Sequence, residues 1–250
     1  MINSRGILTA AAAVLLVGIT APAGAQTFFG QDVRWQPNGA APVAGTLSGA
    51  ARANFLSNLT GVGTENFESF ASGTGSPLPL TFPGAGTATL SNNGVVSNGV
   101  GAGRQATSGS NFWEVTTGSA GNEFVIDFSG LVAAFGVYGI DVGDFGAQLT
   151  LAFYNGATLV NSWSPAHGFG NPSNEGNLNF FGYINSANPF NQIRFTSTGG
   201  GADVWGFDDM TIGSVEQVTG GTVPEPATMT LLATGLAGMA AARRRKKNTA

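Results

Sequence analysis

Apolar and polar residues alternate with a period of two through most of the middle of the chain. Between Phe124 and Phe128, for example, the two phenylalanines and Ile126 fall on one face of an extended strand, and Asp127 falls on the other. The same pattern, interrupted by glycine and proline, predicts strands at residues 65–70, 87–96, 112–117, 123–128, 133–140, 148–154, 158–163, 178–184, 192–197 and 204–212. Asn155-Gly156 predicts a two-residue hairpin turn, because this dipeptide readily adopts positive φ angles.

Helical spacing is convincing in one place. Ala51, Phe55 and Leu59 recur at every fourth position, which predicts a short helix that is capped by Ser48 and runs to Asn58. Residues 26–44, with two prolines, are expected to be irregular. One helix followed by about ten strands predicts an all-β fold, an antiparallel two-sheet β-sandwich of jelly-roll type. A β-helix is the alternative, but no repeat of fixed period supports it.

Composition agrees with many short strands joined by tight turns. Glycine accounts for 39 of the 250 residues, about twice its usual share of roughly 7%. The 18 phenylalanines argue against disorder. There is no cysteine, so stability must come from the core or from a bound metal.

The N-terminus has the pattern of a secretory signal peptide. Arg5 precedes an apolar run from Ile7 to Ile19, and the small residues before Gln26 form a cleavage site. We therefore expect residues 1–25 to be removed during export.

The C-terminus, residues 222–250, has the pattern of a membrane anchor. Pro224 and Pro226 favour an extended, exposed peptide. The sixteen uncharged residues from Ala227 to Ala242 are fewer than the roughly 20 that cross a bilayer comfortably, so insertion should be marginal. The basic cluster that follows favours a cytoplasmic C-terminus, and it consists of Arg243, Arg244, Arg245, Lys246 and Lys247. A helix docked on the domain is the alternative, but nothing else in the chain would satisfy five adjacent cations.

This order of features resembles the bacterial PEP-CTERM sorting signal. The apolar segment and the basic cluster follow a motif made of Val223, Pro224, Glu225 and Pro226. The resemblance implies a transient anchor in the inner membrane of a Gram-negative envelope and cleavage near the motif by an exosortase-type transpeptidase. The two ends together define an exported domain, residues 26–221, destined for the cell envelope or the extracellular space.

The exported domain is strongly acidic. It has four arginines and thirteen acidic residues, a net charge of −9. Such a surface repels nucleic acid and attracts cations.

A second resemblance suggests a metal site. Residues 59–68, 135–146 and 205–212 are similar to segments of uncharacterised PEP-CTERM proteins, and Phe207 to Ile212 also resembles the last strand of jelly-roll, carbohydrate-binding-like modules. In those folds, acids on the first and last strands often hold a structural calcium. The resemblance therefore implies Ca²⁺ ligands among Glu65, Glu68, Asp208 and Asp209. Solvent-facing positions, with one aspartate capping a turn, are the alternative.

Asp141 and Asp144 form a second acidic pair, with a glycine between them. The spacing suits a metal-binding loop and a polar turn equally well.

Aromatic residues on or beside the predicted strands are candidates for stacking against sugar rings. They are Trp113, Trp163, Trp205 and Tyr183. Packing in the core is the alternative for each of them.

Catalytic motifs are not apparent. The single histidine, His167, has no Gly-x-Ser-x-Gly elbow to accompany it. The absence of cysteine excludes thiol catalysis, and one histidine disfavours a typical zinc site. We therefore expect a non-enzymatic envelope or matrix protein that binds exopolysaccharide, a partner that the PEP-CTERM resemblance implies. The alternative is a glycan-active hydrolase or lyase that uses carboxylates such as Glu114, Glu123 or Asp127 across a cleft.

Overall fold

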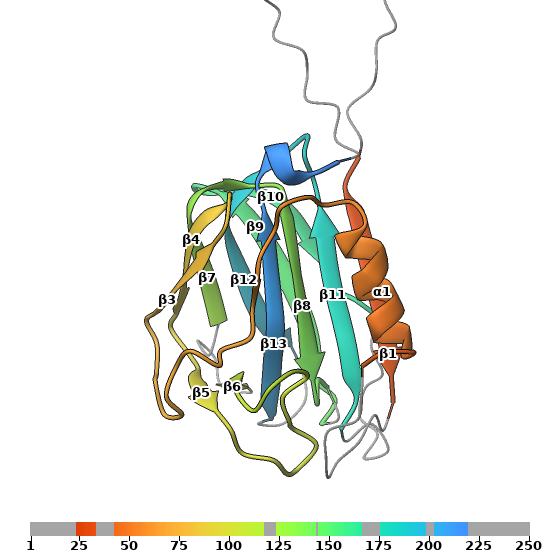
Figure 1. Cartoon of the computed structure of the whole chain (residues 1–250), viewed down its shortest axis with the longest axis vertical. Coiled ribbons are helices and arrows are strands. Elements are labelled where there is room, and N and C mark those ends of the chain that lie inside the picture. Colours follow the sequence, from red (N-terminus) through yellow and green to blue (C-terminus); the bar gives the residue numbers. More distant parts are fainter. Residues whose placement is uncertain are drawn as a thin grey trace, which may run out of the picture.

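The computed structural model describes residues 24–33, 43–117, 124–143, 145–166, 176–198 and 203–219, which form two stacked antiparallel β-sheets (Figure 1). The order in the seven-stranded sheet is β1-β11-β8-β13-β6-β5, and β2 also pairs with β13. Its strands are β1 (Gln26–Asp32), β2 (Thr64–Glu65), β5 (Val95–Ser97), β6 (Phe112–Thr116), β8 (Ala134–Ile140), β11 (Leu178–Ile184) and β13 (Val204–Gly213).

The order in the six-stranded sheet is β10-β9-β12-β7-β4-β3. Its strands are β3 (Leu78–Phe82), β4 (Gly86–Ser91), β7 (Phe124–Val132), β9 (Gln148–Asn155), β10 (Thr158–Trp163) and β12 (Phe190–Thr198). The predicted all-β antiparallel sandwich is therefore confirmed.

The core between the sheets is built largely from aromatic rings. Phe124 of β7 lies with its ring centroid 4.8 Å from that of Phe195 on β12 and 5.6 Å from that of Phe207 on β13. Ile126 and Phe128, the residues predicted to share a face with Phe124, belong to the same buried cluster. Each fully buried side chain of this size contributes roughly 1.5–3 kcal/mol.

Helix α1 (Leu47–Leu56) lies on the outer face of the seven-stranded sheet, where Ala51 and Phe55 are buried as predicted. Its N-cap is Thr46 instead of Ser48, because the Thr46 hydroxyl accepts the Gly49 amide at 2.9 Å. Ser48 lies inside the first turn and donates to the Leu178 carbonyl at 2.8 Å. Asp32, at the end of β1, accepts the first two helical amides.

Two edge strands were missed in the sequence. β1 occupies part of the stretch expected to be irregular, and its weak burial pattern gives little alternation. β3 contains Pro79, which pairs opposite Thr89 at the edge of its sheet. An edge strand needs no amide donor on its free side, so the proline is tolerated there.

Two predicted strands and one turn differ from the structure. The stretch 87–96 forms β4 and β5, which belong to different sheets, and the chain turns between them at Asn92 (φ 70°) and Gly94 (φ 128°). The stretch 65–70 extends only as β2, because Phe67 has a φ of 60°. The hairpin turn between β9 and β10 lies one residue later than predicted, since Asn155 pairs with Thr158 and Gly156 has a φ of 58°.

The two outer faces of the sandwich differ in exposure. Every residue of β8 and β11 is buried, because α1 covers the outer face of the seven-stranded sheet. On β9 buried and half-exposed residues alternate instead. The outer face of the six-stranded sheet is therefore the open face of the domain.

The predicted targeting segments fall almost entirely outside the described residues. The signal peptide up to residue 23 and the whole of 222–250 are not described. Among the described residues no helix is long and apolar enough to cross a membrane.

Candidate functional site

The open face of the six-stranded sheet carries a row of polar side chains at matched positions on four neighbouring strands. Antiparallel register places Tyr154 of β9 opposite Gln192 of β12, Gln192 opposite Asp127 of β7, and Asp127 opposite Thr89 of β4. The preceding or following residue on each strand is buried in the core, so these four side chains point outward. We call this row, together with Arg194 and Ser91 of the next row, the polar face.

Contacts link the polar face into one network. The Arg194 guanidinium lies over the Tyr154 ring, with Cζ 4.7 Å from the ring centroid, and its Nε donates to Gln192 Oε1 at 2.7 Å. Gln192 Nε2 in turn donates to Asp127 Oδ1 at 2.6 Å, and Ser91 Oγ donates to Asp127 Oδ2 at 3.1 Å. All of these residues are half-buried. The side chains are thus held in place before any ligand arrives.

The polar face is close to electrically neutral. It holds one cation, Arg194, and one anion, Asp127, which are joined through Gln192. Its other groups are hydroxyls, an amide and one aromatic ring. Hydroxyls and amides both donate and accept hydrogen bonds, and the phenol ring offers a flat apolar surface with a polar end. These groups suit an uncharged ligand rich in hydroxyl groups.

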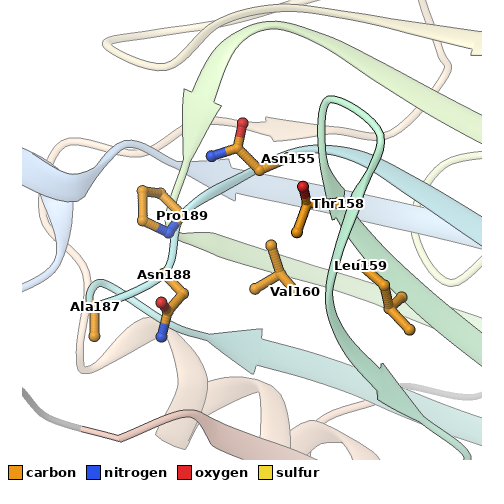
Figure 2. A pocket seen from close by; sticks show the side chains of 7 residues that line it. All are labelled: Asn155, Thr158, Leu159, Val160, Ala187, Asn188 and Pro189. Carbon is orange, nitrogen blue, oxygen red and sulfur yellow. The ribbon is translucent and has the colours of Figure 1, made fainter.

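An open hollow of about 620 Å³ lies beside the polar face, between the β9–β10 hairpin and the turn that precedes β12 (Figure 2). It is lined by Asn155, Thr158, Leu159, Val160, Ala187, Asn188 and Pro189. Leu159 pairs opposite Tyr154, so the hollow adjoins the end of the polar row.

Hydrogen bonds hold the two loops that line the hollow in place, and the side-chain amides of Asn155 and Asn188 remain able to bind a ligand. The Asn188 amide N–H donates to Asn185 Oδ1 at 3.0 Å, and that of Gly156 donates to Asn191 Oδ1 at 2.9 Å. The side chains of Asn155 and Asn188 make no hydrogen bond to any residue that the structure describes. A ligand in the hollow would meet two amides and an apolar wall.

Three of the four predicted ligand-binding aromatics are instead core residues. Trp113 and Tyr183 are 0% exposed and Trp205 is 2% exposed, so the prediction that they contact a glycan is wrong. Trp205 Nε1 donates to Asp203 at 2.6 Å, and the Tyr183 ring stacks on Phe153 with centroids 4.0 Å apart. Their strand positions point inward, where large rings fill the space between the sheets.

Tyr154 of β9 lies on the open face, whereas Trp163 of β10 faces the core, because it pairs opposite the buried Leu151. Trp163, the fourth predicted residue, is half-buried on β10, and its ring lies edge-on to Phe181 with centroids 6.4 Å apart. Tyr154 was not singled out in the sequence, although the alternation of Leu149, Leu151 and Phe153 with polar or small residues places it on the outward side. That alternation is the signal that could have identified it.

Asp208 and Asp209 lie together where β13 changes partner. The register with β8 shifts between Asp208 and Thr211, and Asp209 has a φ of 49°. A loop of distant sequence closes over the pair: Asp208 Oδ2 accepts the Thr107 amide at 2.7 Å, and Asp209 Oδ1 accepts the Ser108 hydroxyl at 2.7 Å. Burial and the neighbouring Asp209 carboxylate raise the pKa of Asp208 to about 8, although the loop donors act in the opposite direction.

The other two predicted calcium ligands, Glu65 and Glu68, also accept hydrogen bonds from backbone amides. Glu68 accepts the Ser110 amide at 2.7 Å, and Glu65 accepts the Phe67 amide at 2.7 Å. In the part of the chain that the structure describes, no three acidic or histidine side chains come together in a group that could hold a metal ion. The four residues therefore do not gather into one group of three or more acids in the described part of the chain. Calcium binding by the domain stays a prediction, which thermal melts with millimolar calcium and with chelator test.

The second acidic pair is only half described. Asp141 is buried, accepts the Gly176 amide at 2.8 Å and lies 3.7 Å from Arg104. Asp144 lies outside the described residues. Asp141 thus serves a polar turn within the fold.

The two described carboxylates of the enzymatic alternative, Glu114 and Asp127, lie on opposite sides of the sandwich. Glu114 of β6 pairs with Arg104 at 3.2 Å on the outer side of the seven-stranded sheet, because its neighbours Trp113 and Val115 point into the core. Asp127 lies on the outer face of the opposite sheet. Stacked sheets are about 10 Å apart, so side chains on opposite outer faces cannot flank one glycosidic bond. Glu123 and His167 lie outside the described residues.

Comparison with known families finds the PEP-CTERM protein-sorting motif at residues 222–246. The motif marks the chain as an exported protein that passes through a membrane-anchored precursor and is processed by an exosortase. No curated protein matches the chain. Among solved structures, a mutant of CBM29-2, a family 29 carbohydrate-binding module, is 14% identical, with a TM-score of 0.29, and the match covers 55% of this chain and 99% of that one. So distant a likeness carries no argument about a ligand.

Proposed function

We propose that the exported domain is a non-catalytic binding module of the cell envelope or extracellular matrix, and that it binds a neutral polysaccharide along the polar face. The observation that supports this proposal most strongly is the network from Tyr154 through Arg194 and Gln192 to Asp127 on the open face of the domain. A network of this kind on an exposed sheet has no role in filling the core.

The size of the polar face suits an extended chain. The row crosses four strands, from Tyr154 on β9 to Thr89 on β4. With strands about 4.8 Å apart, its outer positions are separated by roughly 14 Å. A single sugar ring would cover only part of the row, so the polar face favours a polymer over a monosaccharide.

The charge of the exported domain favours neutral polysaccharides over acidic ones. The exported domain carries a net charge of −9, which repels uronate or sulfate polymers. The polar face itself pairs its one cation with its one anion and offers no excess positive charge. The binding of a neutral polymer is not opposed by this net charge, whereas an acidic polymer is repelled electrostatically.

Affinity measurements on the exported domain test the proposal. We expect binding to a panel of neutral polysaccharides to include at least one ligand, and Tyr154→Ala and Gln192→Ala each to weaken it at least tenfold, about 1.4 kcal/mol. Arg52→Ala is the matched control, because Arg52 lies over Tyr138 on the opposite, helix-covered side of the domain. If Tyr154→Ala, Gln192→Ala and Arg52→Ala bind with equal affinity, the polar face is not the binding site. Release of reducing sugar during the assay would contradict the non-catalytic role.

A further inference from the structure

The described fold begins and ends at the same end of the sandwich. Across the seven-stranded sheet, Gln26 pairs with Ile184, Ile184 with Ala134, and Ala134 with Gly213. The first residue of β1 and the last residue of β13 therefore lie in one row, three strand spacings or roughly 14 Å apart. Figure 1 shows the start of β1 and the blue 3-10 helix after β13 together at the top of the view.

We call this the terminal end of the domain, and six connections, taken together with the strand ends that adjoin them, form it besides the start of β1. They are residues 57–62, 83–86, 129–133, 155–157, 185–189 and 214–219. Gln217 ties three of them together, because its Nε2 donates to the carbonyls of Gly61 at 2.7 Å and Pro83 at 3.0 Å. The hydrogen bonds of Gln217 therefore fix these connections relative to one another.

Charge is distributed very unevenly between the two ends of the domain. Among the described residues, the connections of the terminal end contain one charged side chain, Glu216. At the opposite end, Asp32, Asp141 and Asp203 lie at or beside strand ends, and Arg104 lies 3.7 Å from Asp141. Asp208 and Asp209 lie midway along β13, under the loop that contains Thr107 and Ser108. The acidic character of the domain is therefore concentrated away from the terminal end.

The length of chain between the fold and the predicted anchor is short. Eight peptide units separate Thr219, the last described residue, from Ala227, where the apolar segment begins. At no more than about 3.6 Å per residue they span at most roughly 29 Å. Strand β13, with 10 residues, is itself about 33 Å long. The terminal end therefore stays near the bilayer in the anchored precursor.

We propose that the terminal end is the membrane-facing surface of the precursor and that it lies against the phospholipid headgroups. Anionic lipids give the bilayer a negative surface potential within about a Debye length, which repels the acidic end more strongly than the terminal end, whose one charged side chain is Glu216. The strands then run away from the membrane, and the polar face is accessible along its length. The proposal rests on the membrane-anchored precursor and not on polysaccharide binding.

Fluorescence quenching on the full-length chain tests this orientation. The chain has no cysteine, so a single introduced cysteine carries a unique label. Ala187→Cys at the terminal end and Ala166→Cys at the far end of β10 form a matched pair of exposed alanines. The full chain is reconstituted in vesicles of phosphatidylethanolamine and phosphatidylglycerol that contain a lipid with a quencher on its headgroup.

We expect the label at position 187 to be quenched at least threefold more strongly than the label at 166. Asn188→Cys at the terminal end and Thr198→Cys at the far end of β12 provide a second exposed pair, so the test does not depend on one variant folding. Equal quenching at both ends would overturn the proposal, because the domain would then have no preferred orientation. Stronger quenching at 166 or 198 would also overturn it, because the far end would then be the membrane-facing surface.

Discussion

Arg194 lies over the ring of Tyr154 on the open face of the domain, with its guanidinium carbon 4.7 Å from the ring centroid. The same guanidinium donates to Gln192, so it restrains the ring and the amide together. Arg194 covers one face of the Tyr154 ring and restricts the rotation of the Tyr154 side chain. This pair sets the geometry of the polar face.

Arg194→Ala should weaken polysaccharide binding three- to tenfold while changing the free energy of unfolding by no more than about 1 kcal/mol. Exposed cation–π contacts are worth roughly 0.5–1 kcal/mol, and the loss of restraint affects the ligand more than the fold. Isothermal titration and urea unfolding measure the two quantities. Arg52→Ala, which removes the guanidinium over Tyr138 at 5.7 Å, should leave binding unchanged. A large loss of stability in Arg194→Ala without a binding defect would refute the positioning role.

Gly94→Ala should destabilise the domain by more than about 2 kcal/mol, because the new side chain meets a buried ring. A Cβ at this position would come within 2.3 Å of the Trp113 ring, and the backbone has a φ of 128°. Both the ring and the backbone would have to move, and the ring is fully buried.

Gly73→Ala is the control for that substitution. Gly73 has a φ of 91°, but apart from the glycine and its two chain neighbours no atom lies within 4 Å of the place that an added methyl group would occupy. It should therefore show only the backbone cost of about 1 kcal/mol. Chemical unfolding of both variants separates packing from conformational strain. Equal effects would show that Trp113 can move and that the core is looser there than the structure indicates.

Asp208 should make the domain less stable as the pH rises from about 4 to 8. The pKa of Asp208 is raised to about 8 in the fold, whereas an unfolded aspartate has a pKa near 3.9. The folded state therefore holds the proton more tightly in this window. The contribution to stability is complete below about pH 4 and is lost as the pH passes through 8, at up to about 1.4 kcal/mol per pH unit.

Unfolding in urea at pH 5.0, 6.5 and 8.0 measures this slope. Asp208→Asn should flatten it relative to the unmodified domain, and Glu216→Gln, at an exposed site, should leave it in place. Identical slopes in Asp208→Asn and the unmodified domain would mean that Asp208 is ionised throughout, held by the donors from Thr107 and Ser108.

Local patterns in the sequence predicted the strands better than they predicted the roles of side chains. The bounds of β10 and β11 match the predictions because clear turn residues flank both. Pro79 concealed β3, since a proline excludes a central strand and its sequence does not say that the strand is at an edge. Alternation gives two faces for each strand, but it does not say which face meets the other sheet. For this reason the sequence leaves both ligand contact and core packing open for Trp113 and Trp205, which are buried, and does not single out Tyr154.

The polar face and the acidic pair depend on contacts that no spacing along the chain reveals. Thr107 reaches Asp208 across 101 residues, and Gln192 reaches Asp127 across 65. Both contacts are set by the order of strands in the sheets, which brings β12 beside β7 and folds the loop before β6 over β13. The sequence contained the right residues, and the topology decided which of them meet.

Mapping by NMR of the exported domain, titrated with oligosaccharides of a neutral polysaccharide that it binds, tests the central claim most directly. We predict that the amide and side-chain signals that shift are those of Tyr154, Gln192 and Arg194, with the neighbouring residues of β9, β12 and β7. Shifts confined to the seven-stranded sheet, or no shift with any neutral glycan, would contradict the claim that the polar face is a polysaccharide-binding surface.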